Sequence, residues 1–457
     1  MTTREKVDQL ESRLNVTELK VNTFGQQFQV YPWLKGRLFY KMITGNETLQ
    51  KRDLKLYWKQ ITSIFYGILN LFRRYDIWAF STSLERRPIE GKQFDKLFDY
   101  VGNESGYKTL VIETRIFHYH PYRSIASRYA ISRSFFLLFE EIYGRLFLRN
   151  TRVNDEALLK AINSNVSEGI DHRTLLRKYL AQYRLMKFWL KILPNPKLVM
   201  LSVSYTNFGY IKAFKERGIK VAEVQHGIIT KNHHAYNYAK GFTSDQFPDY
   251  LLTIGKKEKA VFDLANKFPV REVIPVGSYI IDHYATFKIN SGYRKKPLVL
   301  FTLQDGQIGD KFIEFILGFK ASDHEHFDIL VQPRRNSKEN YLKRYAELDS
   351  IEFSNQDFYS TVVKADLHCT VYSTTAIESL SLGIPNILVN IDDQSVEQLG
   401  PVLGGNQYTK VAQSHANFLE ALDLLKNSDP ERVKLSNEDN IMVNYKVNIT
   451  QFLKEVI

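Results

Sequence analysis

"KLVMLSVSYTNFGYIKAFKERGIKVAEVQ", residues 197–225, is the stretch that decides the fold. It opens on an apolar run typical of a buried strand, continues with the spacing of a helix, and reaches Gly218, which stops that helix. A second apolar run follows at 220–225. Short β-rich runs that alternate with helices indicate parallel strands in an α/β layer.

The same alternation extends in both directions from this unit. Further strand-like runs occupy 76–83, 107–114, 249–255 and 272–278, and a long helical stretch lies between about 122 and 190. The polar, basic stretch "ATFKINSGYRKKP" at 285–297 then interrupts the pattern. A second series of strands and helices begins after it, so the sequence predicts a second domain of the same type.

We therefore predict an α/β protein with two Rossmann-like, doubly wound domains, a cleft between them and a helical N-terminal extension. The expected boundaries are 1–75 for the basic and aromatic extension, 76–290 for the N-terminal domain with its helical insertion, and 291–457 for the C-terminal domain. The last helices, after about residue 412, can pack on either domain.

Composition narrows the classes of protein. The chain has 457 residues with 44% apolar and 25% charged, which is typical of a folded globular protein. It has one cysteine, Cys369, so no disulfide can form within the chain. The net charge is +12, yet no zinc-ligand spacing, RNP-like motif or helix-turn-helix pattern is present, and we do not expect nucleic acid as a partner.

The N-terminal 75 residues hold 13 Lys and Arg against 6 Asp and Glu, a balance suited to an anionic surface. Their start lacks the apolar core of a signal peptide, and the run at 61–72 is too short to span a bilayer. We expect a cytoplasmic protein that can bind the inner face of the cell membrane peripherally. The apolar stripe over 54–72 predicts a helix, which either packs on the core or lies in a membrane interface.

Polar residues that directly follow the strands are the candidates for function, because ligands in open α/β sheets bind beyond the carboxyl ends of the strands. His226 is one of them, and a histidine there can take a proton from a hydroxyl group. Gly227 would let a substrate approach the backbone. The alternative is a histidine that bonds a neighbouring carbonyl while Gly227 makes the turn.

A second candidate is "TVYSTTAIESLSLGIPNILV" at 370–389, where a strand leads into Ser373, Thr374 and Thr375 at the start of a helix. Hydroxyls and free backbone N–H groups at such a start can bind a phosphate. The alternative is a capping box, in which Thr375 and Glu378 satisfy the helix end without a ligand. Glu378 can also bond a ribose hydroxyl.

Charged residues after other strands have two interpretations each. Arg86 and Arg87 can contact an anionic acceptor or belong to a charged loop, and Glu113 can be a base or nucleophile, or a salt-bridge partner. Asp305 can be catalytic or can bond the amides of its glycine loop. The histidines show no third ligand at metal-binding spacing, so we expect no metal.

The pattern of Ser373, Glu378, Gly383 and Pro385 resembles the nucleotide-binding segment of glycosyltransferases with two Rossmann-like domains, the GT-B fold. "VQHG" resembles a segment of bacterial capsule and surface-polysaccharide transferases, among them Kdo transferases, and of CDP-glycerol glycerophosphotransferases. "PDYLLTIGKKEKAVF" and "VIPVGSYIID" resemble the segments that follow it there. The resemblance covers about residues 197–392.

This resemblance implies roles for several residues. It implies that His226 activates the acceptor hydroxyl, with Gln225 and Gly227 beside the acceptor. In "ILVQPRRN", Gln332 stands where these families usually have a histidine, and a glutamine cannot act as an acid. Some Kdo transferases are similar at this position, which favours a CMP-linked donor. Arg334 and Arg335 follow it and match the geometry of a phosphate, unless they are a solvated helix start.

The expectation is therefore a glycosyltransferase that moves a sugar from a nucleotide-sugar donor to a glycan or glycolipid acceptor in bacterial surface polysaccharide biosynthesis. The nucleotide-sugar is a substrate, and we expect no cofactor and no metal. The alternatives are a CDP-glycerol-type polyol-phosphate transferase, a nucleotide-sugar 2-epimerase, and a non-catalytic assembly factor.

Overall fold

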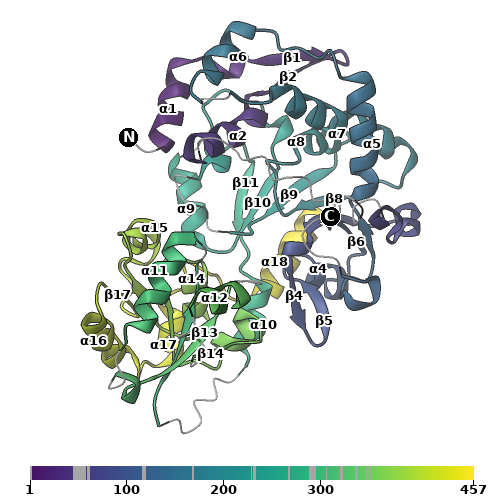
Figure 1. Ribbon diagram of the computed structural model, residues 1–457. Helices are drawn as coiled ribbons and strands as arrows, with labels where there is room; N and C mark the ends of the chain where they lie inside the picture. Colours follow the sequence, from purple (N-terminus) through teal and green to yellow (C-terminus); the bar gives the residue numbers. More distant parts are fainter. Residues whose placement is uncertain are drawn as a thin grey trace. The chain divides into compact units, whose positions relative to one another are not determined.

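A computed structural model describes residues 3–44, 58, 62–115, 120–166, 169–227, 229, 233–265, 268–287, 295–304, 306–319, 323–334, 338–345, 348 and 351–457. Its chain divides into two compact units (Figure 1). The first comprises Met1–Thr253, Glu258–Pro275 and Lys446–Ile457, and the second comprises Ile254–Lys257 and Val276–Tyr445.

The first unit is built on a parallel sheet with the strand order β11-β10-β9-β8-β3-β6-β7. The strands are almost entirely buried, as expected for a parallel sheet that is covered on both faces. Their bounds are β3 Ile77–Thr82, β6 Thr109–Thr114, β7 Ala130–Ser132, β8 Leu198–Leu201, β9 Lys220–Val224, β10 Tyr250–Thr253 and β11 Glu272–Pro275.

Helices and two short hairpins surround this sheet. The helices are α1 Thr3–Arg13, α2 Tyr31–Thr44, α4 Asp99–Glu104, α5 Ser134–Phe147, α6 Glu156–Asn163, α7 His172–Ile192, α8 Phe208–Glu216, α9 Lys256–Ala265 and α18 Tyr445–Val456. The hairpins are β1 Lys20–Thr23 with β2 Gln26–Gln29, and β4 Arg86–Ile89 with β5 Lys92–Asp95. The C-terminal helix α18 packs here, with the ring of Phe452 5.3 Å from that of Tyr250.

The N-terminal elements belong to the core of the first unit. Tyr31, Trp33 and Leu34 of α2 are buried in the same apolar cluster as the strands of the sheet. The indole N–H of Trp33 donates a hydrogen bond of 2.8 Å to the side chain of Gln246. These aromatic side chains therefore face the protein interior and offer no surface to a membrane.

The helix predicted over 54–72 is wrong for the part that the structure describes. Residues Ser63–Phe65 and Ile68–Phe72 form two short 3-10 turns, and most of 54–61 lies outside the described residues. Gly67 separates the turns with φ +63°, and a Cβ there would stand 2.0 Å from the carbonyl oxygen of Ala130. The close approach of β7 requires this glycine, and the glycine breaks the helix.

The second unit is built on a parallel sheet with the order β14-β13-β12-β15-β16-β17. Its strands are β12 Leu298–Thr302, β13 Asp328–Gln332, β14 Glu352–Phe353, β15 Leu367–Thr370, β16 Asn386–Val389 and β17 Thr409–Ala412. Its helices are α10 Tyr279–Ala285, α11 Gly306–Leu317, α12 Lys338–Arg344, α13 Phe358–Val362, α14 Thr375–Ser381, α15 Gln394–Leu403, α16 His415–Leu425 and α17 Pro430–Leu435.

The predicted fold class is confirmed: the chain is an α/β protein with two doubly wound parallel sheets. The sequence did not reveal the short strands β7, β14 and β17 or the two hairpins. The predicted cleft and the assignment of acceptor and donor to separate domains stay predictions. In the described part of the chain, no helix combines the length and apolar character needed to cross a membrane.

Candidate active-site residues at the carboxyl edges of the two sheets

Gln225, His226 and Gly227 form the exit of β9 at the carboxyl edge of the first sheet. Gln225 is buried, and its amide donates hydrogen bonds to the carbonyl of Gly227 at 2.8 Å and to the carboxylate of Glu258 at 3.0 Å. These bonds hold the turn in one conformation. Gln225 therefore positions its neighbours, and its predicted contact with an acceptor stays a prediction.

His226 is half-buried at this turn, and its Nδ1 has no hydrogen-bond partner among the residues that the structure describes. Burial lowers the pKa of the imidazole below its usual value of 6.5, and the positive charge of Lys96 lowers it further. The carboxylate of Glu85 and the backbone of Ser202 act in the opposite direction. A ring with these properties is neutral at pH 7 and can accept a proton.

Gly227 is not required by the local backbone, because it is not among the glycines with a positive φ. A Cβ added to it would meet no described atom within 4 Å. Neither the turn nor the packing thus explains a glycine here. The open space is consistent with the predicted approach of a substrate to this backbone.

A buried carboxylate lies two residues before Gln225. Glu223 accepts hydrogen bonds from the backbone N–H of Ser204 at 3.2 Å and from the hydroxyl of Tyr236 at 2.8 Å. Burial raises the pKa of Glu223 to about 7. The sequence analysis missed this residue, although a glutamate inside the apolar run "KVAEVQ" is itself a signal, since buried carboxylates are rare without a partner or a function.

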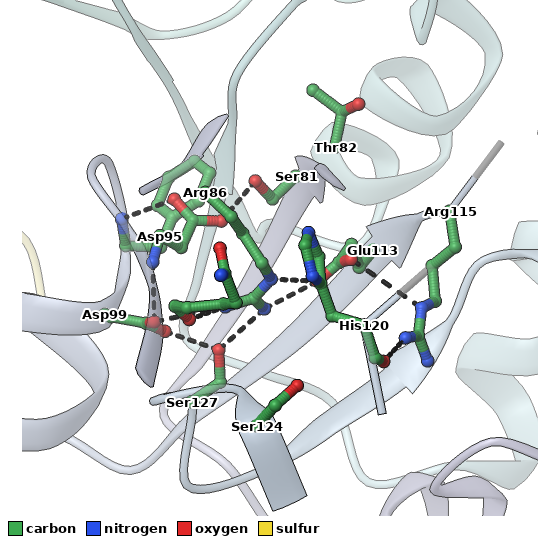
Figure 2. A network of polar contacts seen from close by, with 12 residues as sticks. Ser81, Thr82, Arg86, Asp95, Asp99, Glu113, Arg115, His120, Ser124 and Ser127 are labelled. Carbon is green, nitrogen blue, oxygen red and sulfur yellow. Dashed lines mark hydrogen bonds and ion pairs between the residues drawn. The ribbon is translucent and has the colours of Figure 1, made fainter. Parts of the chain in front are cut away.

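Glu113 and Arg86 meet in a buried network at the ends of β3 and β6 (Figure 2). Two nitrogens of Arg86 lie 2.6 and 2.5 Å from one oxygen of Glu113, and a third nitrogen lies 3.3 Å from Asp99. Arg86 also donates to the hydroxyl of Ser127 at 2.9 Å. The salt-bridge interpretation of Glu113 fits this geometry, and catalytic or acceptor-binding roles for this pair stay predictions.

The network holds two further carboxylates close together. Burial and the neighbouring Asp99 raise the pKa of Asp95 to about 7, against the lowering effect of Arg86 and Ser81. Burial also raises the pKa of Asp99. Burial disfavours the charge of Arg86, but Glu113 and the two aspartates outweigh it and raise the pKa of the guanidinium.

Arg87 is adjacent in sequence and different in environment. It is half-buried, and its guanidinium donates at 2.7 Å to the carbonyls of Leu84 and of Arg86. Both bonds close the turn that leads into β4. The predicted contact of Arg87 with an acceptor stays a prediction.

In the second unit, Gln332, Gln304 and Ser373 follow the three adjacent strands β13, β12 and β15. Gln332 pairs in register with Thr302, and its amide donates to the carbonyl of Gln356 at 3.2 Å. Its Oε1 is buried and has no partner within the described part of the chain. The structure thus brings Gln332 to the same sheet edge as the serine and threonines of the predicted donor site.

Gln304 connects these strand ends. Its amide donates to the hydroxyl of Thr370 at 3.3 Å and to the carbonyl of Tyr372 at 3.0 Å, while its own carbonyl accepts from the hydroxyl of Tyr341. The segment that enters the Ser373–Thr375 turn is therefore tied to the end of β12.

Helix α14 begins at Thr375, as the sequence predicted, but the alternative of a capping box is wrong. Thr374 occupies the cap position without a side-chain bond, and the hydroxyl of Thr375 has no partner among described residues. The hydroxyl of Ser373 accepts instead from the backbone N–H of Thr375 at 3.3 Å. Glu378 is half-buried one turn further on.

A buried polar group beneath α14 sets the position of the helix. The ring of His368 lies 2.9 Å from the hydroxyl of Thr302 and 2.8 Å from the side-chain oxygen of Asn386. Asn386 in turn donates to the carbonyl of Ala376 in α14 at 2.6 Å. Burial lowers the pKa of His368 to about 4, so the ring is neutral. The histidine is hidden in the run "ADLHCTVYS", and the sequence analysis did not single it out.

Of the remaining predicted residues, Arg334 is exposed just after β13, whereas Asp305 and Arg335 lie outside the described residues.

In the first unit, His226 is close enough to His233 to influence its titration, and burial lowers the pKa of His233 to about 3. Even so, no group of three or more potential ligands in the described ranges could hold a metal ion.

No protein-family model matches the chain, and neither does any curated protein sequence. Among solved structures it is similar to the UDP-GlcNAc 2-epimerase of Methanocaldococcus jannaschii in complex with UDP-GlcNAc and UDP, with 14% identity, coverage of 83% of this chain and 99% of that chain, and a TM-score of 0.47. It is also similar to the wall teichoic acid polymerase TagF, with 11% identity, 94% and 97% coverage and a TM-score of 0.42. CalG4, the calicheamicin glycosyltransferase, has 12% identity, 84% and 98% coverage and a TM-score of 0.48. Similarity at this level does not identify a reaction or a ligand.

Proposed function

We propose that the chain is a GT-B-type glycosyltransferase that moves a sugar from a nucleotide-activated donor, with CMP-linked donors favoured, to a glycan on a lipid or polysaccharide carrier. The observation that carries the proposal is His226 at the exit of β9, half-buried, with a lowered pKa and an Nδ1 that has no partner among the described residues. The neutral ring accepts the proton of an acceptor hydroxyl while the oxygen of that hydroxyl forms a bond to the anomeric carbon of the donor sugar.

The bond between that carbon and the donor phosphate breaks in the same reaction, and its electron pair leaves with the nucleotide. The second unit supplies groups suited to this leaving group. The hydroxyl of Thr375, which has no partner among the described residues, can donate to a phosphate oxygen, and Arg334 presents a cation. A guanidinium beside the departing phosphate stabilises its charge. The preference for CMP rests on Gln332 and on the resemblance to Kdo transferases.

The test measures transfer from CMP-, CDP- and UDP-linked donors to a glycan acceptor by the full chain. The substitution His226→Ala should lower kcat by about 10²- to 10⁴-fold, which is the usual contribution of a general base, and should leave nucleotide affinity unchanged. The rate should also fall as the pH drops below the lowered pKa of His226, because the protonated ring cannot accept a proton. An exposed histidine, His326→Ala, is the matched control.

The alternatives give different outcomes. Unchanged turnover in the His226→Ala variant would refute the proposed base. Product formed from the donor alone, without an acceptor, would indicate a 2-epimerase, and transfer of glycerol phosphate from CDP-glycerol would indicate a polyol-phosphate transferase. Thr375→Val should weaken nucleotide binding and leave folding intact, which tests the donor site separately from the base.

A further inference from the structure

The first unit exposes a concentrated set of large apolar side chains on the turns at 63–72, on α5 and near the end of α7. They are exposed by 38 to 78% and make up half of the twenty large apolar side chains that are exposed in the described residues. We call them the α5 apolar surface: Phe65, Leu69, Phe72, Leu138, Phe139, Ile142, Leu146, Phe147, Phe188 and Ile192.

Contacts between the elements show that the turns at 63–72, α5 and the end of α7 pack side by side. The ring of Trp189 in α7 lies 5.5 Å from that of Phe139 in α5 and 5.2 Å from that of Phe188. The hydroxyl of Ser63 donates to that of Ser134, the first residue of α5, at 3.0 Å. Helix α5 lies along the outer side of the first unit (Figure 1).

The apolar face of α5 is regular. Leu138, Ile142 and Leu146 follow one another at intervals of four residues, so they form one stripe along the helix, and all three are exposed. A helix that packs only on its own protein turns such a stripe inward. Helix α5 does so with Phe136 and Gly144, and it carries this second stripe on its outer side.

The charges that border the α5 apolar surface are mostly positive. The segments 62–75, 134–152 and 185–197 contain eight Lys and Arg against two Glu, of which Glu140 is buried. Three of the eight cations are in ion pairs: Arg145 with Glu141, Lys187 with Glu216 and Lys197 with Asp76. Exposed cations flank the apolar side chains on each element: Arg73 and Arg74 after the turns, Arg149 and Arg152 after α5, and Lys191 in α7. Apolar side chains bordered by cations match the headgroup region of an anionic bilayer.

We propose that the α5 apolar surface docks on an anionic lipid bilayer, with its apolar side chains at the boundary of headgroups and acyl chains and its cations on lipid phosphates. It includes Phe65, Leu69 and Phe72 of the 54–72 stretch, whereas Tyr31 and Trp33 of the N-terminal extension are buried. This inference goes beyond the proposed transferase reaction and does not depend on it, because lipid binding is measured without turnover.

The experiment is vesicle flotation with the full chain, using phosphatidylcholine alone and phosphatidylcholine mixed with phosphatidylglycerol. The wild-type chain should float with the anionic vesicles and be released by about 0.5 M salt, which screens the cations. The double variant Leu146→Ser, Phe147→Ser removes two side chains that are 68% and 69% exposed and should bind at least about tenfold more weakly.

The matched control is Leu424→Ser, Leu435→Ser, which removes two equally exposed leucines, at 71% and 62%, from the second unit and should bind as the wild type does. An unchanged circular dichroism spectrum and an unchanged unfolding midpoint in both variants show that the chain is folded. Absence of wild-type binding to anionic vesicles, or equal binding by the Leu146→Ser, Phe147→Ser variant, overturns the proposal. A wild-type dimer that this variant converts to a monomer would instead identify an interface between two copies, and would also overturn it.

Discussion

The first strands of the two sheets are held at their carboxyl ends by different chemistry. In the first unit, the buried guanidinium of Arg86 lies among the carboxylates of Glu113, Asp99 and Asp95 (Figure 2). In the second unit, a buried network of neutral groups lies beneath α14, with His368 between Thr302 at the end of β12 and Asn386 at the start of β16. One network is thus built on charges and the other on neutral hydrogen bonds.

The charged and the neutral network differ in their sensitivity to substitution and to acid. A buried charge without its counter-ion is strongly destabilising, so each member of the first network depends on the others. Neutral hydrogen bonds contribute less individually, and losing one leaves only a polar group unsatisfied. The neutral network, however, requires that its histidine stays uncharged, which makes it sensitive to acid. Three substitutions test this comparison.

The largest effect is expected for Arg86→Leu, which leaves three buried carboxylates without their shared cation. The free energy of unfolding should fall by about 3 to 5 kcal/mol, measured by chemical denaturation at pH 7. Adding Glu113→Gln to the variant should recover part of the loss, because it removes a buried carboxylate that is left with the more distant Arg115, at 3.7 Å, as its cation. Arg87→Leu is the control, since its guanidinium bonds only backbone carbonyls among the contacts at this turn. If Arg86→Leu lowered the free energy of unfolding by less than about 1 kcal/mol, the buried ion pairs of Arg86 would not be what stabilises this end of the sheet.

The second-largest effect is expected for His368→Gln, which tests how acid destabilises the neutral network around this histidine. His368 has a pKa of about 4 in the folded protein against 6.5 unfolded, so the folded state binds fewer protons between these values. The stability that the neutral form of His368 contributes is fully present above pH 6.5. As the pH falls from 6.5 towards 4, the free energy of unfolding should decrease by about 3 kcal/mol. In His368→Gln this part of the pH dependence should disappear, as followed by denaturation between pH 4 and 7. His326→Gln should retain it, and an unchanged pH profile in His368→Gln would show that another group is responsible.

The smallest effect is expected for Asp95→Asn. The pKa of Asp95 is raised to about 7, so its contribution to stability is present at low pH and is lost as the pH rises through 7. Asparagine keeps the acceptor for the backbone N–H groups of Leu97 and Phe98 and removes the charge beside Asp99. Relative to the wild type, the variant should gain about 2.5 kcal/mol between pH 5 and pH 8. A variant that loses stability most at pH 8 would show that the Asp95 charge is needed.

Much of the scaffold could be predicted from particular residues. The apolar runs at 198–201 and 220–224 are strands because nearly every one of their side chains is buried between helices. The β4–β5 hairpin escaped prediction because "RRPIEGKQFD" has the composition of a charged loop. Its turn places Glu90 and Gly91 at positive φ, a local signal that the charges obscured.

The features of the candidate site also fall into two groups: those that the sequence predicted and those that only the structure revealed. The position of His226 after a strand followed from the order of apolar runs, and so did the helix start at Thr375. That Glu113 pairs with Arg86, and that the Nδ1 of His226 lacks a partner among the described residues, depends on side chains that other segments of the chain bring near. No local pattern records which of several carboxylates a buried guanidinium will contact.

The sequence by itself determined the two α/β units and the residues that end their strands, because hydrophobic periodicity and turn residues act over a few neighbouring positions. Only the tertiary structure decided which charges are buried together, which pKa values shift, and that the exposed apolar side chains gather on α5, the turns at 63–72 and the end of α7, while Tyr31 and Trp33 are buried. The physical reason is that burial and electrostatic coupling depend on distances in space between residues that the chain order separates.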